Sequence, residues 1–178
     1  AAVAYGLDKK VEGNFVIYDL GGGTFDISIL RLENGLFEVM ATHGDSALGG
    51  DDFDHLIEQW MISDFDTPMP NIKTKQRIKN LSRKIKEDLT ERNEVVINQS
   101  FDGLGTIKKT LTREKFASLS ADLTNKTITC IKQALHDADL TPKDITGVVM
   151  VGGSTRMPII QVAVEQFIGM PLLNNIDP

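Results

Sequence analysis

Residues 19–26 read Asp-Leu-Gly-Gly-Gly-Thr-Phe-Asp, and they join two apolar runs through three consecutive glycines. Residues 15–18 are β-branched or aromatic and residues 27–30 alternate in polarity, so both runs predict strands. The glycines fall where the chain reverses, and without side chains they let backbone N–H groups approach an anion closely. The stretch is either a hairpin with a phosphate-binding turn or a plain hairpin connector.

The residues that flank these glycines favour phosphate and magnesium chemistry. Asp19 ends the first strand with its carboxylate directed at the turn, and Mg²⁺ prefers oxygen ligands while keeping several waters. Thr24 adds a hydroxyl beside the same anion. Asp26 is either a supporting carboxylate or an ordinary turn-capping residue.

A second glycine cluster follows another apolar run, residues 147–151. There Gly152-Gly153-Ser154-Thr155-Arg156 leads into Met157-Pro158, which predicts a strand, a turn and a helix. In doubly wound α/β folds ligands sit at such turns, although a tightly packed connector has the same pattern. Arg156 adds a cation and a planar stacking surface, and two such turns in one chain strengthen the prediction of a site.

A third segment, Gly49-Gly50-Asp51-Asp52-Phe53-Asp54, ends a loop and begins a helix. Carboxylates in a first helical turn complement the helix dipole. We therefore expect a structural role for the three aspartates and an exposed position for His55.

Taken in their order along the chain, the three segments resemble those of one family, the seventy-kilodalton heat-shock chaperones, or DnaK-like proteins. Residues 19–26 resemble the second phosphate motif of their nucleotide-binding domain, residues 49–54 its Gly-Gly-Glu/Asp-Asp-Phe-Asp segment, and residues 151–158 its adenosine motif. Actin and the sugar kinases share a looser phosphate motif, but the other two segments favour the chaperones. The resemblance spans nearly the whole chain.

The resemblance implies an α/β chain that forms the second lobe of a two-lobed, actin-like (ribonuclease H-like) ATPase, with ATP or ADP and Mg²⁺ between the lobes. A base subdomain would comprise residues 1–50 and 112–178, and a smaller α+β cap subdomain residues 51–111. The family's first phosphate loop, cleft lysine and one aspartate belong to the first lobe and have no match here. Alone, the chain is expected to be inactive.

The resemblance also implies roles for single residues. Asp19 would anchor Mg²⁺ through water, Thr24 would position water or the γ-phosphate, and Asp26 would support them, as phosphoryl transfer requires. Nucleotide contacts are implied for Gly21, Gly22, Gly23, Thr24, Gly49, Gly50, Lys86, Thr90, Gly152, Gly153, Ser154, Arg156 and Met157.

The cap helix matches the family only in part. Lys86 and Thr90 fit its Lys-x-x-Leu-Ser/Thr pattern, and an ammonium with a hydroxyl one turn on would grip ribose hydroxyls. The usual acidic residue one turn earlier is Arg83, and Glu87 replaces a base-stacking cation. A carboxylate cannot stack as a cation does, so we expect modest nucleotide affinity, or an interaction module that no longer binds nucleotide.

The same helix and the run Gly-Gly-Asp-Asp-Phe-Asp-His-Leu resemble the specialised iron–sulfur-assembly chaperones of the HscA type, as does the short loop at residues 64–74. This type implies a J-domain co-chaperone, an iron–sulfur scaffold protein or unfolded client held by a peptide-binding domain outside this chain, and exchange without a separate factor. A generalist DnaK-type chaperone and an actin-like filament ATPase are the alternatives.

Composition fits a compact α/β unit, since the chain has 178 residues, 41% of them hydrophobic. A net charge of −6 argues against a nucleic-acid surface. We expect most cations of residues 73–86 on a solvated helix face.

The single cysteine, Cys130, excludes an internal disulfide and a zinc cluster, and we expect it to be buried. No apolar run is long enough for a bilayer, so we expect cytoplasm or an organelle matrix. The chain is separately expected to be a monomer.

Hydrophobic periodicity predicts the order of elements. A helix end with a Gly6 C-cap is expected at residues 1–6, and an acidic residue of the family would follow Pro178. The remaining expectations are strands at 14–20, 25–32 and 35–42, helices at 51–64 and 73–90, strands at 94–99 and 105–111, a long helix at 112–138, a strand at 146–151 and a helix at 157–168.

Overall fold

The computed structural model describes residues 12–65 and 71–173. The helix end expected at residues 1–6, part of the loop at 64–74 and the last residues before Pro178 lie outside these ranges. The chain divides into two compact units, residues 1–50 with 124–178 and residues 51–123. Both mix strands and helices, as the sequence predicts.

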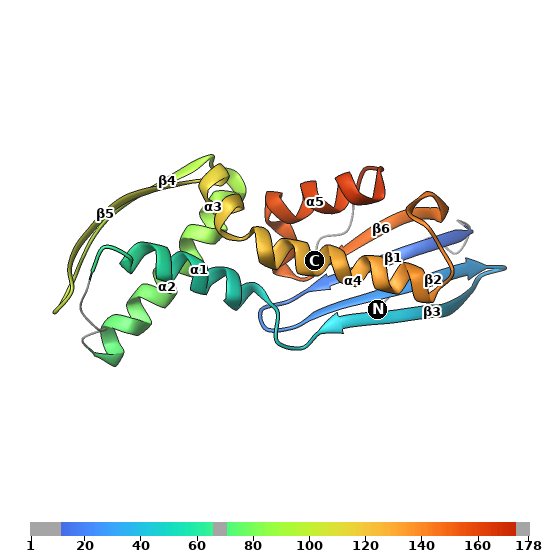
Figure 1. The fold of residues 1–178 in the computed structure, drawn as a ribbon, viewed down its shortest axis with the longest axis horizontal. Coiled ribbons are helices and arrows are strands. Elements are labelled where there is room, and N and C mark those ends of the chain that lie inside the picture. The colour runs from blue at the N-terminus through green and yellow to red at the C-terminus, as the bar shows by residue number, and fades with distance from the viewer. Residues whose placement is uncertain (1–11, 66–70, 174–178) are drawn as a thin grey trace. The chain divides into compact units, whose positions relative to one another are not determined.

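The larger unit is built on a four-stranded sheet in the order β3-β2-β1-β6 (Figure 1). Strands β1 (Gly13–Leu20), β2 (Phe25–Glu33) and β3 (Leu36–Asp45) form an antiparallel meander, and β6 (Ile145–Val151) pairs in parallel with β1. Helices α4 (Ala121–Asp137) and α5 (Pro158–Ile168) approach each other where Lys132 Nζ lies 5.5 Å from the Phe167 ring centroid. Short 3₁₀ turns, η1 (Pro142–Asp144) and η2 (Gly153–Arg156), flank β6.

The register of the meander is fixed at both of its turns. Asn34 and Gly35 have φ values of 52° and 73°, so they form the tight left-handed turn that joins β2 to β3 and matches the strand twist. At the other turn Leu20 pairs with Phe25 and Asp19 with Asp26. The rings of Tyr18 and Phe25, 4.7 Å apart, are fully buried behind this turn.

The smaller unit packs three helices and a two-stranded sheet. They are α1 (Gly50–Ile62), α2 (Ile72–Glu91), the antiparallel strands β4 (Glu94–Phe101) and β5 (Gly105–Thr112), and α3 (Arg113–Leu119). Phe53 of α1 meets Phe116 of α3 edge-on at 6.4 Å. Its core is completed by the buried side chains Ile57, Met61, Ile78, Ile85, Leu89, Ile97, Phe101, Ile107 and Leu111.

The single helix expected at 112–138 is wrong, because the chain breaks at Ser120. This residue leaves helical geometry at φ −99° and ψ 7°. Its backbone N–H and its hydroxyl both donate to Phe116 O, at 3.0 and 2.7 Å, so α3 ends in a closed turn at this residue before α4 begins. The other described elements begin and end within three residues of their expected bounds.

The division between the compact units follows from this break. It lies after Leu123, beyond the boundary expected at 111, because α3 packs Phe116 on α1. The assignment of the two parts as base and cap subdomains stays a prediction.

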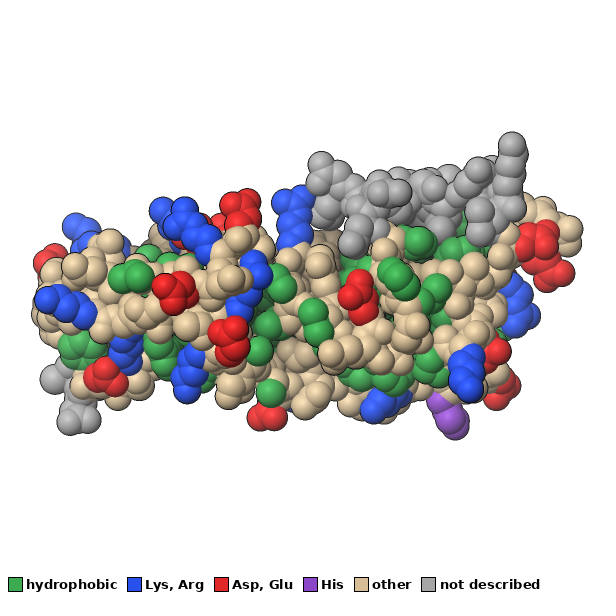
Figure 2. All heavy atoms as spheres, turned by 90° about the horizontal axis from the view of Figure 1, so that it is seen from above, with side chains coloured by type: hydrophobic (Ala, Val, Ile, Leu, Met, Phe, Trp, Pro, Cys, Tyr) green, Lys and Arg blue, Asp and Glu red, His purple; other side chains and the backbone are tan. Residues whose placement is uncertain are grey.

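Surface features agree with most expectations from composition. The cations of residues 73–84 are exposed, whereas Lys86 is buried. Blue and red side chains are interspersed on the face shown in Figure 2. Cys130 is half-buried rather than buried, and its partial burial raises the thiol pKa. In the described ranges, no helix combines the length and apolarity needed to cross a membrane.

Arg113 closes the carboxyl end of α2. Its Nε donates to Leu89 O and its Nη2 to Thr90 O, both at 2.7 Å, while Nη1 donates to Asn93 Oδ1 at 3.1 Å. The last carbonyls of a helix have no partners within it, and a cation there also complements the dipole. Arg113 therefore ties α2 to the start of α3.

We predict that Arg113→Ala lowers the free energy of unfolding by about 1.5–3 kcal/mol, since two helix carbonyls lose charge-assisted hydrogen bonds. Urea denaturation measures the loss. Arg92→Ala is the matched control, because Arg92 is exposed and its cap bond to Asp88 O is made by the backbone. Equal losses for the two variants would contradict the capping role.

Candidate functional site

The glycine turn between β1 and β2 is a compact loop closed by its own backbone. The N–H of Gly21 donates to Thr24 O at 3.0 Å. Gly22, Gly23 and Thr24 are exposed, while Leu20 and Phe25 on either side are fully buried. The turn is therefore anchored at its base and open at its tip.

The three segments singled out in the sequence meet at one atom, the carbonyl oxygen of Gly21. It accepts a hydrogen bond from Gly50 N–H at 2.9 Å and another from the Ser154 hydroxyl at 3.1 Å. Gly50 is the first residue of α1, and Ser154 lies in the turn after β6. The three segments therefore come together in the larger unit.

Two glycines of these segments are required by packing. A Cβ on Gly49 would lie 2.5 Å from the Gly23 Cα, closer than real side chains approach. Gly152 has φ 89°, and a Cβ there would clash with Leu20 O. Backbone therefore packs on backbone on both sides of the glycine turn.

The other glycines of the site face open space. A Cβ on Gly22, Gly23 or Gly153 would meet no atom within 4 Å, and none of these residues has a positive φ. Neither packing nor backbone geometry accounts for glycine at these positions. A ligand that approaches the backbone would explain glycine at these positions, because a phosphate bound by N–H groups leaves no room for a side chain.

Two carboxylates stand at the base of the turn. Asp19 and Asp26 are direct partners across β1 and β2, and like charges in that arrangement repel. Partial burial and then the Asp26 charge raise the Asp19 pKa. A cation would relieve this repulsion, and Mg²⁺, which keeps most of its waters, suits a site with few protein ligands. Within the described residues no cluster of three metal-binding side chains occurs.

The turn after β6 has a buried and an exposed part. Ser154, Thr155 and Met157 are buried, and the Thr155 hydroxyl donates to Gly152 O at 2.7 Å. Arg156 is exposed. The Ser154 and Met157 side chains thus serve the fold of the turn, and Arg156 is the one of the three predicted side chains that a ligand can reach readily.

The helix residues predicted to contact nucleotide lie in the smaller unit. Lys86 Nζ is 2.8 Å from Asp54 Oδ1, and both side chains are nearly inaccessible, at 9% and 3% exposure. The Thr90 hydroxyl donates to Glu87 O at 2.7 Å. The two residues that depart from the family pattern pair with each other, with Arg83 Nε 3.0 Å from Glu87 Oε1.

The Asp54–Lys86 ion pair is the contact that sequence reasoning missed, since Asp54 was expected only to complement the helix dipole. A signal was present, because each charge falls on the apolar face of its helix, beside Phe53 and Ile57 in α1 and beside Ile85 and Leu89 in α2. Opposite charges on buried faces of neighbouring helices are expected to pair. Burial raises the Asp54 pKa, and Lys86 counteracts part of this rise.

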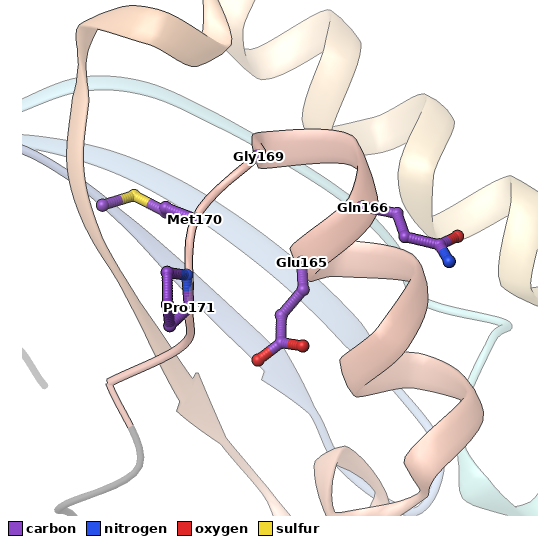
Figure 3. Close-up of a pocket in the computed structure, with 5 residues that line it drawn as sticks. All are labelled: Glu165, Gln166, Gly169, Met170 and Pro171. Carbon is purple, nitrogen blue, oxygen red and sulfur yellow. The ribbon is translucent and has the colours of Figure 1, made fainter.

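A pocket of about 310 Å³ lies elsewhere, at the carboxyl end of α5. Figure 3 shows Glu165 and Gln166 on the last turns of α5 and Gly169, Met170 and Pro171 on the segment that follows. Glu165 Oε1 accepts from Leu172 N–H at 3.3 Å, which holds that segment against the helix. None of the site residues predicted from the sequence lines this pocket.

Comparison with known proteins gives one consistent result. A family model described as Hsp70 protein matches residues 1–178. A chaperone protein HscA homolog of Methylobacillus flagellatus is 48% identical over 178 residues, and homologs of the same name from Acidovorax sp. strain JS42 and Shewanella putrefaciens are 44% and 46% identical. Each match covers 100% of this chain but only 28–29% of the relative.

We predict that Gly49→Ala lowers the free energy of unfolding by about 1–3 kcal/mol, the usual cost of an overpacked site, because the new methyl group would collide with the glycine turn. Gly153→Ala is the matched control, since its Cβ meets open space, and it should change stability by less than about 0.5 kcal/mol. Thermal and urea denaturation measure both. A destabilised control would mean that the open space is not available to a side chain.

Proposed function

The chain belongs to the Hsp70 family, and we propose that it is the adenosine- and phosphate-binding lobe of an ATP-dependent chaperone. The complete protein would hydrolyse ATP to drive client binding and release. The observation that carries this proposal is the meeting of three glycine segments at Gly21 O, with open space over Gly22, Gly23 and Gly153. The chain spans under a third of the length of these relatives, so further parts of the site would come from other residues.

We also infer the finer fold from family membership. The larger unit would be the ribonuclease H-like base of an actin-like ATPase lobe, and the smaller unit its α+β cap. The antiparallel meander with a parallel fourth strand supports the first assignment.

The phosphate side of the proposed site consists of the turn and its two carboxylates. Backbone N–H groups of Gly22 and Gly23 would bind phosphate oxygens, and the Thr24 hydroxyl would orient the attacking water. Asp19 would hold a water of the metal shell, with Asp26 supporting it across the strand pair. When bound, Mg²⁺ neutralises charge on the β- and γ-phosphates.

Adenosine contacts are proposed for residues of each unit taken by itself. In the larger unit Gly152 and Gly153 would let the base approach the backbone, and the exposed Arg156 would stack or pair with it. In the smaller unit Lys86 and Thr90 would contact the ribose hydroxyls. Gly49 and Gly50, which are buried against the glycine turn, would shape the site rather than touch the ligand.

Asp19→Asn in the complete protein tests this proposal. The amide keeps the shape of the side chain but loses its charge, so we expect ATP turnover to fall about 10- to 100-fold, as for other residues that act on a metal through its shell. Asp139→Asn is the control, because Asp139 is exposed at φ 54°, which Asn tolerates. Steady-state phosphate release measures both, and unchanged turnover in Asp19→Asn would remove this carboxylate from the site.

We propose that the chaperone is of the HscA type and acts in iron–sulfur cluster assembly. The relatives that match over the whole chain carry the HscA name, and the α2 sequence independently resembles that type. A J-domain co-chaperone and an iron–sulfur scaffold protein would be its partners, in the cytoplasm or an organelle matrix.

A scaffold protein should therefore stimulate ATP turnover of the complete protein, and a generic unfolded peptide should not. We expect stimulation of about tenfold, the scale of a typical coupling energy between two sites. Equal stimulation by both would instead favour a generalist DnaK-type chaperone, and nucleotide-dependent light scattering would indicate a filament-forming ATPase.

A further inference from the structure

A buried charge pair joins α1 to α2 inside the smaller unit. Asp54 lies on the buried face of α1 and Lys86 on the buried face of α2, and their charged atoms are 2.8 Å apart. The apolar side chains beside them, Phe53, Ile57 and Ile85, are at most 1% exposed. An acidic and a basic side chain are thus held in a mainly apolar part of the core, where Glu58 of α1 and Ser82 of α2 are the buried polar residues one turn away.

Stability alone is a poor explanation for this pair. Removing two charges from water costs several kcal/mol each, and replacing a buried ion pair by apolar residues is often neutral or stabilising. Burial raises the Asp54 pKa even with Lys86 beside it, which shows that desolvation opposes the charged form. The pair therefore points to a requirement other than stability.

The pair does fix the position of a cation. A free lysine side chain samples many rotamers, and holding it in one costs conformational entropy. Because Asp54 orders the Lys86 side chain during folding, a ligand that binds Lys86 loses no further affinity to ordering that side chain. The exposed lysines of the same helix, Lys73, Lys75 and Lys84, have no such buried carboxylate.

Lys86 and Thr90 are one helical turn apart, so they lie on neighbouring positions of one face. The Thr90 hydroxyl donates its proton to Glu87 O, and its oxygen then acts as an acceptor. An ammonium donor beside a hydroxyl acceptor matches two adjacent hydroxyls of a sugar, one accepting and one donating.

We propose that Asp54 is a positioning residue, which holds the Lys86 ammonium where it binds the ribose of the nucleotide. This inference rests on the proposed nucleotide-binding function. Asp54 does not touch the nucleotide itself, so its effect should depend on the ribose hydroxyls and on Lys86.

The structure offers a matched control for Asp54. Asp51 and Lys79 join the same two helices, at 3.5 Å, but their side chains are 59% and 51% exposed. Asp51→Asn therefore removes a carboxylate of α1 that pairs with a lysine of α2, in water rather than in the core. Exposed pairs of this kind contribute little.

The test is calorimetric titration of the complete protein with Mg·ADP and with Mg·3′-deoxy-ADP and Mg·2′-deoxy-ADP. We expect Asp54→Asn to weaken ADP binding about 10- to 100-fold, the scale of a lost charge-assisted hydrogen bond, and to abolish the preference for ADP over its deoxy analogues. Asp51→Asn should change neither. Lys86→Met should match Asp54→Asn, and the double variant should be no weaker than Lys86→Met, because both changes remove one interaction.

Each other outcome has a distinct meaning. No binding of Mg·ADP by the unmodified protein would overturn the proposed function itself. If the Lys86→Met protein binds Mg·ADP with unchanged affinity, this inference is overturned. It is also overturned if the Asp54→Asn protein keeps its full preference for ADP over the deoxy analogues. If Asp54→Asn fails to fold by circular dichroism, Asp54→Glu carries the test, because it keeps the charge and displaces it by one methylene. A folded Asp54→Glu with unaltered preference would also overturn the inference.

Discussion

The larger unit depends on the carbonyl oxygen of Gly21, which accepts hydrogen bonds from Gly50 and Ser154, residues 29 and 133 positions away. Because both donors bind the same oxygen, the three segments lie so close together that a side chain at some of their positions would not fit. Glycine at 49 and 152 follows from that approach. Glycine at 22, 23 and 153 does not follow from that close approach. The fold therefore requires glycine at 49 and 152, whereas a ligand would require it at 22, 23 and 153.

In the smaller unit, cations from other elements bind the carboxyl ends of α1 and α2. Neither α1 nor α2 has a basic residue in its last turn. Lys109 of β5 donates to Trp60 O near the end of α1 at 2.7 Å, and Arg113 does the same at the end of α2. The β-hairpin and α3 thereby satisfy carbonyls that the helices leave unpaired, so the order α1, α2, hairpin, α3 is locked by polar contacts as well as by its core.

The sequence was sufficient for the elements whose signals are local. Runs of apolar, β-branched and aromatic residues located β1, β2 and β6, and three glycine segments identified the candidate site. What failed had no signal that sequence alone could separate from its alternatives. At Ser120 one residue departs from helical dihedrals, whereas Ser82, whose hydroxyl also bonds the carbonyl four residues earlier, lies within the unbroken α2. Likewise, acidic residues at the start of α1 look alike in sequence, although only Asp54 faces the core.

The presence of Arg83 and Glu87 on α2 is related to the buried carboxylate of Asp54. Their own ion pair is exposed on both sides, so it contributes little to stability. Arg83 also acts on Asp54, where its charge opposes the rise in pKa that burial causes. The resemblance leads us to expect an acidic residue at position 83, which would add to that rise. Arg83 lowers the Asp54 pKa less than Lys86 does, so the exposed pair of Arg83 and Glu87 modulates a carboxylate whose main partner is the buried Lys86.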